Sequence, residues 1–80
     1  MKQSRHPLLL KSLGQRLREI RQMRHLSQEE LAWKADLELS QISRIERGVI
    51  NTSISQLFII AKALEVTLPE LFDFEMPDEE

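Results

Sequence analysis

Three side chains that each carry several hydrogen-bonding groups recur at three-residue intervals in the middle of the chain: Gln41, Arg44 and Arg47. An arginine guanidinium presents a planar fork of donors that suits an anion or a pair of acceptor atoms, and a glutamine amide both donates and accepts. Neither group is a nucleophile or a general base at ordinary pH. The spacing therefore indicates a surface that recognises a polar or anionic partner.

The rest of the chain offers little catalytic chemistry. It contains no cysteine, and His6 and His25 each stand without neighbouring ligands, so no metal site is expected. The sequence also contains no nucleophile–base pair and no glycine-rich phosphate loop. We therefore expect neither an enzyme nor a bound cofactor.

The segment around the three residues carries the start and stop signals of two short helices. Ser27 and Glu30 have the spacing of a capping box, which predicts a helix from there to Ala35. After a tight turn, a second helix is expected over about 38–47, and Gly48 ends it by adopting the left-handed backbone conformation. Two short helices joined by such a turn form a helix-turn-helix.

Further helices are expected on both sides of this pair. Apolar residues at spacings of three and four predict one helix over about 8–24 and another that begins after the cap Ser53. A fifth, short helix is expected to start at the cap Thr67. With no strand pattern and no repeat, the sequence predicts an all-α domain over residues 1–74, packed from residue 8 onward.

Charge is divided unevenly along the chain. Residues 1–62 hold all 11 Lys and Arg and six acidic residues, a net charge of +5, whereas residues 63–80 hold seven acidic residues and no base. This asymmetry favours a body that meets a polyanion, with residues 75–80 as an acidic, disordered tail that faces away from it. The tail could instead serve only to keep the protein soluble.

The stretch SQEELAWKADLELSQISRIERG, residues 27–48, resembles the helix-turn-helix of the Cro/C1 repressor family, also called the Xre family. The likeness runs from about Leu13 to Phe72. It implies a five-helix, lambda-repressor-like domain that binds double-stranded DNA as a homodimer on a palindromic operator. Restriction-modification controllers and small phage-type repressors are the members that fit best.

The resemblance also implies which side chains read bases. It places them in the first turns of the second helix of the pair and one residue beyond: Glu38, Leu39, Ser40, Gln41 and Arg44. Arg44 matches the acceptors of guanine, Gln41 suits adenine or a phosphate, and Leu39 can contact a thymine methyl. Glu38 is expected foremost as the helix cap, and otherwise as an acceptor from cytosine.

Other residues are expected to fix the position of this helix. Gln28, at the start of the preceding helix, would contact a backbone phosphate, because a helix N-terminus offers free amides and positive dipole. Arg47 and Asn51 would contact phosphates without reading sequence. Arg21 and Glu46 match a structural ion pair of the family.

Three positions depart from simple expectations. Asp36 and Glu65 stand where the family often has glycine, so both should adopt the left-handed backbone, at a cost of roughly 1 kcal/mol for glutamate. Trp33 lies one step off the inward side of its helix and is expected to cover the edge of the core.

The C-terminal part is expected to form the dimer interface, from the fifth helix and the neighbouring face of the fourth: Ile59, Leu68, Leu71, Phe72 and Phe74. The phenylalanines could instead close the core of one chain.

A second function also stays open. The chain could be an antitoxin-like interaction module that binds a partner protein, with DNA binding secondary. In either case no membrane-spanning stretch and no apolar leader is expected, which favours a cytoplasmic location. Operator sequence, effector, and activation against repression are not determined by these residues.

Overall fold

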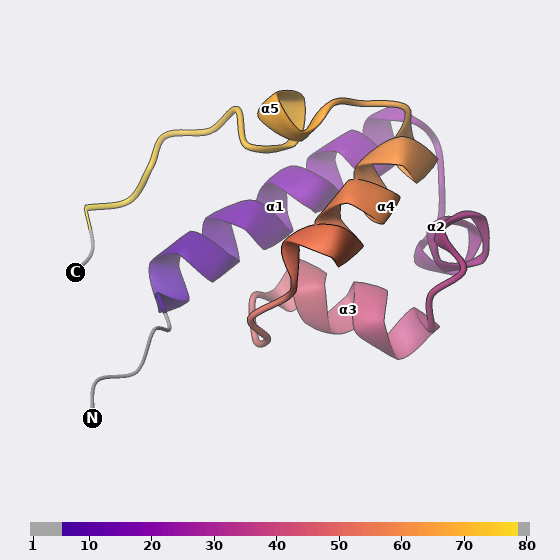
Figure 1. Ribbon diagram of the computed structural model, residues 1–80, viewed down its shortest axis with the longest axis horizontal. Helices are drawn as coiled ribbons and strands as arrows, with labels where there is room; N and C mark the ends of the chain where they lie inside the picture. The colour runs from indigo at the N-terminus through magenta and orange to yellow at the C-terminus, as the bar shows by residue number, and fades with distance from the viewer. Residues whose placement is uncertain (1–5, 79–80) are drawn as a thin grey trace.

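The computed structural model describes residues 6–78 of the 80-residue chain. Within them are five α-helices and no strand (Figure 1): α1 (Pro7–Met23), α2 (Gln28–Ala35), α3 (Leu39–Arg47), α4 (Ile54–Leu64) and α5 (Leu68–Leu71). The predicted all-α fold of five helices is confirmed. The start of the chain, where no leader is expected, and residues 79–80 of the expected tail lie outside the described residues.

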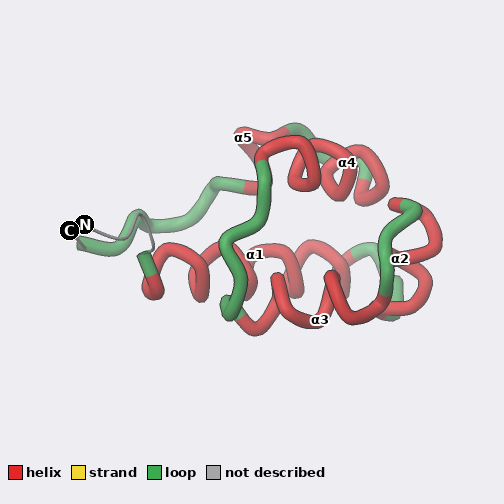
Figure 2. The backbone as a smooth tube through the Cα atoms, turned by 60° about the horizontal axis from the view of Figure 1, so that its bottom comes forward, coloured by secondary structure: helices red, strands yellow, loops and turns green. Residues whose placement is uncertain are grey.

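α1 is the longest of these helices and crosses the middle of the molecule in Figure 1. α3 packs against both α1 and α2, while α2 also contacts α4. α5 contacts α1 and α4, and it lies on the other side of α1 from α3 (Figure 2). Within residues 6–78, no helix has the length and apolarity that crossing a membrane would need.

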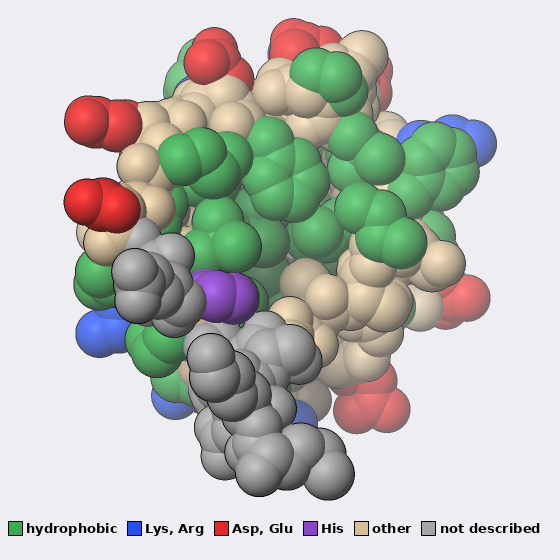
Figure 3. Space-filling model, turned by 60° about the vertical axis from the view of Figure 1, so that its left-hand side comes forward, with side chains coloured by type: hydrophobic (Ala, Val, Ile, Leu, Met, Phe, Trp, Pro, Cys, Tyr) green, Lys and Arg blue, Asp and Glu red, His purple; other side chains and the backbone are tan. Residues whose placement is uncertain are grey.

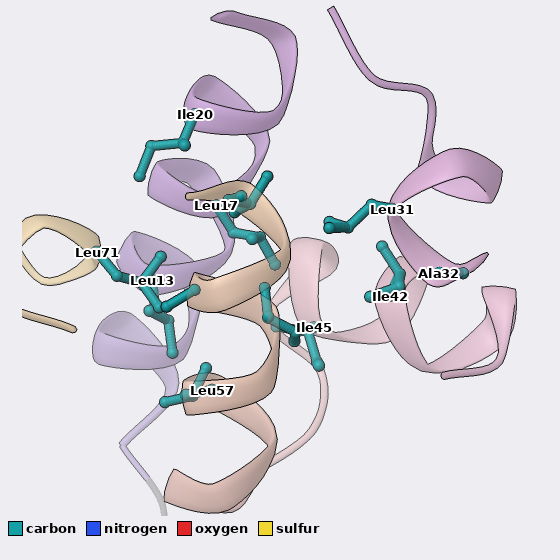
Figure 4. Close-up of a cluster of buried hydrophobic side chains, with 12 residues drawn as sticks. Leu13, Leu17, Ile20, Leu31, Ala32, Ile42, Ile45, Leu57 and Leu71 are labelled. Atoms are coloured by element: carbon teal, nitrogen blue, oxygen red, sulfur yellow. The ribbon is translucent and has the colours of Figure 1, made fainter. Parts of the chain in front are cut away.

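Apolar side chains from all five helices meet in one core (Figure 4). Six large side chains in it are almost completely buried: Leu17, Leu31, Ile42, Ile60, Leu64 and Leu71. Leu71 of α5 points toward Leu13 of α1 (Figure 4). The expectation that Leu71 belongs to a dimer surface is therefore wrong, because this four-residue helix uses its one fully buried leucine to close the core.

A close approach of α1 to α3 depends on Gly14. A Cβ atom at this position would lie 2.5 Å from the carbonyl oxygen of Ile45 and closer still to that of Glu46. Because these are backbone atoms, they could not move aside without shifting the helix. Gly14 thus lets the last turn of α3 rest directly on the backbone of α1.

Hydrogen-bonded caps start three of the helices as the sequence predicts. At α2 the Ser27 hydroxyl accepts from the Glu30 amide at 3.0 Å, and the Glu30 carboxylate accepts from the Ser27 amide at 2.8 Å. Thr67 and Glu70 repeat this reciprocal box at α5. Ser53 caps α4 by accepting from the amide of Gln56 at 3.1 Å.

Four helices end in the same way, with one residue in the left-handed conformation followed by an apolar residue. The left-handed residues are His25, Asp36, Gly48 and Glu65, with φ of 58°, 55°, 71° and 61°. In each case the next amide donates to the carbonyl five residues back, as from Leu37 to Ala32 at 2.9 Å. This is a Schellman-type ending. The conformations predicted for Asp36 and Glu65 are confirmed, and that of His25 is an addition.

Trp33 is 84% exposed, so the expectation that it covers the core edge is wrong. α2 buries Leu31, Ala32 and Ala35. Since each residue advances about 100° around a helix, Trp33 lies nearly opposite to Leu31 and Ala35.

After α5, residues 73–78 have no regular helix and extend toward the start of α1 (Figure 1). Met76 and Pro77 line a shallow hollow of about 190 Å³ there, together with His6 and Leu9. The described part of the acidic tail therefore lies beside the first turn of α1.

Candidate nucleic-acid interface

The outward side of α3 is a polar stripe. Ser40, Arg44 and Arg47 follow one another at helical spacings, and all three are exposed. Ile42 and Ile45 are buried on the opposite side. α3 lies at the lower edge of the molecule with no element beyond it (Figure 1), and Figure 2 turns this edge toward the reader. The stripe projects as a helix that enters a groove must.

The first turn of α3 places the other expected base-reading residues. Glu38 is the N-cap, as predicted, and Gln41 completes the cap because its Oε1 accepts from the Glu38 amide at 2.9 Å. Gln41 is half-buried, and its amide oxygen is engaged in this bond. In this conformation both Nε2 hydrogens and the second lone pair of Oε1 are left for a partner. Leu39 is an exposed apolar side chain in the same turn.

A buried carboxylate joins three helices behind this stripe. The side chain of Glu46 has no exposed surface, and it accepts from Arg21 of α1 at 2.6 and 3.0 Å. Arg21 and Glu46, expected as an ion pair, are thus in direct contact. Gln28 of α2 donates to the same carboxylate at 2.9 Å, and Arg18 of α1 does so at 3.3 Å. One side chain of α3 therefore fixes the positions of α1 and α2.

These contacts set the charge of the cluster. Burial acts to raise the pKa of Glu46, but the hydrogen bonds from Arg21, Gln28 and Arg18 and the positive charge of Arg21 together outweigh it. The pKa of Glu46 consequently lies below its ordinary value, and the group stays ionised. The hydrogen bond between Arg21 and Glu46 also raises the pKa of Arg21. The cluster of two arginines and one glutamate keeps a net positive charge.

The three expected phosphate contacts lie at different places. Gln28 is the first residue of α2, and its amide is turned toward Glu46. Arg47 and Asn51 are exposed at the end of α3 and in the following loop. The Nε of Arg47 lies 3.4 Å from the carbonyl oxygen of Ser43, one turn back. The Arg47 guanidinium therefore lies along the α3 stripe.

Two further arginines have a structural task that the sequence does not reveal. Arg16 donates twice to the carbonyl of Glu70, at 3.1 and 3.0 Å. Arg24 donates to the carbonyls of Leu64 at 3.0 Å and Glu65 at 3.3 Å, where α4 ends. These bonds span 40 residues or more of sequence, so no local spacing could have predicted them.

A second surface, apolar in character, covers the end of the molecule where α1 begins (Figure 3). On α4, Ile54 and Phe58 are 62% and 52% exposed, and the ammonium of Lys62 lies 5.6 Å from the centroid of the Phe58 ring. Phe72 and Phe74 are half-buried against the core. We call Ile54, Phe58, Phe72 and Phe74 the apolar face.

The expected interface residues only partly coincide with this face. Phe72 and Phe74 belong to it, and Leu68 is half-buried next to the core. Ile59 is 41% exposed but lies about 100° around α4 from Phe58. Sequence reasoning missed Ile54 and Phe58, although Leu57–Ile60 are four consecutive apolar residues. A run of that kind exceeds what one inward stripe can bury.

Comparison with known proteins agrees with this geometry. The family model HTH_3, helix-turn-helix, matches residues 17–71. Control protein C.BamHI of Bacillus amyloliquefaciens is 45% identical over 62 residues, which are 76% of this chain and 76% of that protein. The crystal structure of the controller C.AhdI from Aeromonas hydrophila has a TM-score of 0.77 at 43% identity, covering 79% of this chain and 96% of that one.

A third similar protein has been solved with DNA. The structure of the controller C.Esp1396I as a tetramer in complex with its natural 35-base-pair operator has a TM-score of 0.76 at 37% identity. The match covers 81% of this chain and 86% of that one. The family model alone spans more than half of the sequence. This chain therefore belongs to the HTH_3 helix-turn-helix family and is a transcriptional regulator of that type, not an enzyme.

Proposed function

We propose that this protein controls the genes of a restriction-modification system by binding their operator DNA as a homodimer, with α3 in the major groove. The match covers 76% of control protein C.BamHI and 96% of the C.AhdI chain, against 38% of the immunity repressor of Bacillus phage phi105 and 36% of the regulator PuuR of Escherichia coli. C.Esp1396I, a protein of the same family, binds its operator as a tetramer. These proteins support the controller role.

The observation that carries the proposal is the α3 stripe. Ser40, Arg44 and Arg47 are exposed on a helix whose other side is buried. Arg44 lies in the middle of the stripe, where its guanidinium can donate to O6 and N7 of one guanine. Arg47, at the end of the helix, is better placed for a phosphate that fixes the register.

Two copies would place two such helices on one face of the duplex. Half-sites of a helix-turn-helix dimer lie roughly 34 Å apart, one turn of DNA. The apolar face supplies a surface for the second copy, because it leaves large side chains such as Phe58 half exposed in a single chain. A symmetric contact there would make the operator a palindrome.

Selection of bound duplexes from a random pool, followed by affinity measurements on the selected site, tests the function. Arg44→Ala should weaken binding to that site by about 1–3 kcal/mol and relax preference at one base pair. Arg47→Ala is the comparison, because loss of a phosphate contact weakens binding about equally on every sequence. An Arg44→Ala loss that is equal on selected and scrambled duplexes would contradict base reading by this residue.

An antitoxin-like interaction module is the second candidate. The apolar face favours it, because a partner protein could cover that surface in place of a second copy. The two functions differ in what the purified chain does alone. A controller should dimerise and bind duplex DNA without help. An antitoxin-like module should stay monomeric until its partner protein is added.

A further inference from the structure

Arg18 of α1 lies where α1, the start of α2 and the side of α3 meet. Its Nε and the Nε2 of Gln28 donate to the same oxygen, Glu46 Oε1, at 3.3 and 2.9 Å. The two nitrogens are therefore at most about 6 Å apart. The Arg18 side chain is 48% exposed, whereas that of Arg21 is only 11% exposed. Part of the Arg18 guanidinium thus faces solvent beside the first turn of α2.

Arg18 is not needed to neutralise Glu46. Arg21 already makes two bonds to that carboxylate, one of them at 2.6 Å, whereas the single bond from Arg18 is long at 3.3 Å. A guanidinium has five N–H donors, and this contact uses one of them. The positive charge of Arg18 is therefore in excess within the cluster.

The position of Arg18 along α1 keeps it next to the last turns of α3. Gly14, one turn earlier on the same side of α1, rests on the carbonyls of Ile45 and Glu46. Arg47 directly follows Glu46, and Ser43 is one turn before Arg47. Arg18 and Gln28 thus lie together on the Glu46 carboxylate, one residue before Arg47 of the α3 stripe.

We propose that Arg18 is a further residue that binds a backbone phosphate of DNA. Glu46 holds it beside Gln28, so that both side chains contact the strand that borders the major groove. This inference rests on the proposed function, because the ligand is the backbone phosphate of a DNA duplex. A guanidinium donates charge-assisted hydrogen bonds to phosphate oxygens in the required geometry. The contact reads no sequence and adds equally to binding on every duplex.

The salt dependence of binding measures this contact directly. Each phosphate neutralised contributes about 0.9 to the slope of log affinity against log salt. Because the proposed homodimer carries two copies of Arg18, Arg18→Gln should lower that slope by about 1.8, so that raising salt from about 50 to about 200 mM weakens the variant about 12-fold less than the unchanged protein. Affinity should fall by the same factor on selected and scrambled duplexes, and Arg18→Lys should keep most of the slope because it keeps the charge.

Arg24→Gln is the matched control. It makes the same substitution at the C-cap of α1 and removes the same charge, but the Arg24 guanidinium is held at the end of α4. Its slope should equal that of the unchanged protein. Circular dichroism melting of each variant confirms that the binding experiments are made on folded protein.

The outcomes separate the inference from the function. If the unchanged protein binds duplex DNA and Arg18→Gln keeps its slope, Arg18 has a structural role at most, and the inference is overturned even if the melting temperature falls. If the unchanged protein shows no duplex affinity in dilute buffer, the proposed function itself fails.

Discussion

Glu46 links three helices of the candidate interface, α1, α2 and α3, through its carboxylate. Its carboxylate, buried in α3, receives hydrogen bonds from two residues of α1 and one of α2. A buried ion pair contributes little by itself, but removing one partner leaves the other charge without compensation. The network therefore fixes the orientation of α3 against α1 more than it adds net stability.

Stability should depend on acid through this carboxylate. The pKa of Glu46 is lower in the folded chain than in the unfolded one, so its contribution is present above the unfolded pKa and is lost as pH falls through the folded pKa. The cap hydrogen bonds at Ser27 and Thr67 also lower the pKa values of Glu30 and Glu70, which adds to the same trend. Urea midpoints should consequently fall on acidification below about pH 5.

Glu46→Gln isolates the contribution of the buried group. At neutral pH it should cost about 3 kcal/mol, since it leaves Arg21 without its charged partner, and its urea midpoint should change less between neutral and acidic pH. An identical pH dependence in the variant and the unchanged protein would show that acid acts elsewhere.

At the scale of the helices, the ends are more uniform than the sequence suggests. Four helices stop at a left-handed residue followed by an apolar one, yet only Gly48 is a glycine. Glycine is favoured at position 48 for two reasons. The backbone there is left-handed, and a Cβ atom would lie 2.7 Å from the Cα of Lys11. At Glu65 the same backbone conformation carries a side chain, which costs roughly 1 kcal/mol or more.

Glu65→Gly should therefore stabilise the fold. Relief of the left-handed strain outweighs the greater flexibility that glycine gives the unfolded chain, for a net gain of about 0.5–1 kcal/mol in the free energy of unfolding. Thermal unfolding measures it as a raised melting temperature. Gly48→Ala, at a position of the same backbone type, should have the opposite effect, and a lowered melting temperature for Glu65→Gly would refute the argument.

The elements could be predicted because their signals are local. The capping box of Ser27 and Glu30, the stop at Gly48 and the three-and-four spacing of leucines lie within single turns. The same periodicity makes one side of α3 buried and leaves Arg44 exposed. The helix bounds follow to within one or two residues.

What could not be predicted depends on neighbours distant in sequence. Arg18 and Glu46 are 28 residues apart in sequence, and their contact depends on the way α1 crosses α3. Leu71 lies in a helix of four residues, which is too short for periodicity to show which side is inward. Trp33 is expected at the core edge because it lies one step off the inward side of its helix, whereas burial of Leu31 and Ala35 turns it to solvent.

On the scale of the whole molecule, the α3 stripe and the described part of the acidic tail lie on different sides of α1 (Figure 1). The α3 stripe is at the lower edge in Figure 1, whereas α5 and the start of the acidic tail lie on the far side of α1. The described residues of the tail, 75–78, therefore do not oppose the phosphates that α3 would approach (Figure 1). The apolar face draws its residues from α4 and from the segment after α5 and includes none from α3, so a second copy could bind there without using the α3 stripe.

Phe58→Glu tests whether this face joins two chains. Phe58 is 52% exposed, so a single folded chain can accommodate a charge there, whereas the same change at the fully buried Leu71 would unfold the core. If Phe58 is central to the contact, its loss should cost about 2 kcal/mol, or about thirtyfold in the dimer dissociation constant. Sedimentation would then show monomers, which should bind a palindrome weakly because each half-site must be occupied independently.

Trp33→Glu replaces another exposed aromatic, on α2 and outside the apolar face, and should leave sedimentation unchanged. If Phe58→Glu also sediments like the unchanged protein, the second copy binds through another surface, and the DNA-reading helices must be spaced by a different contact.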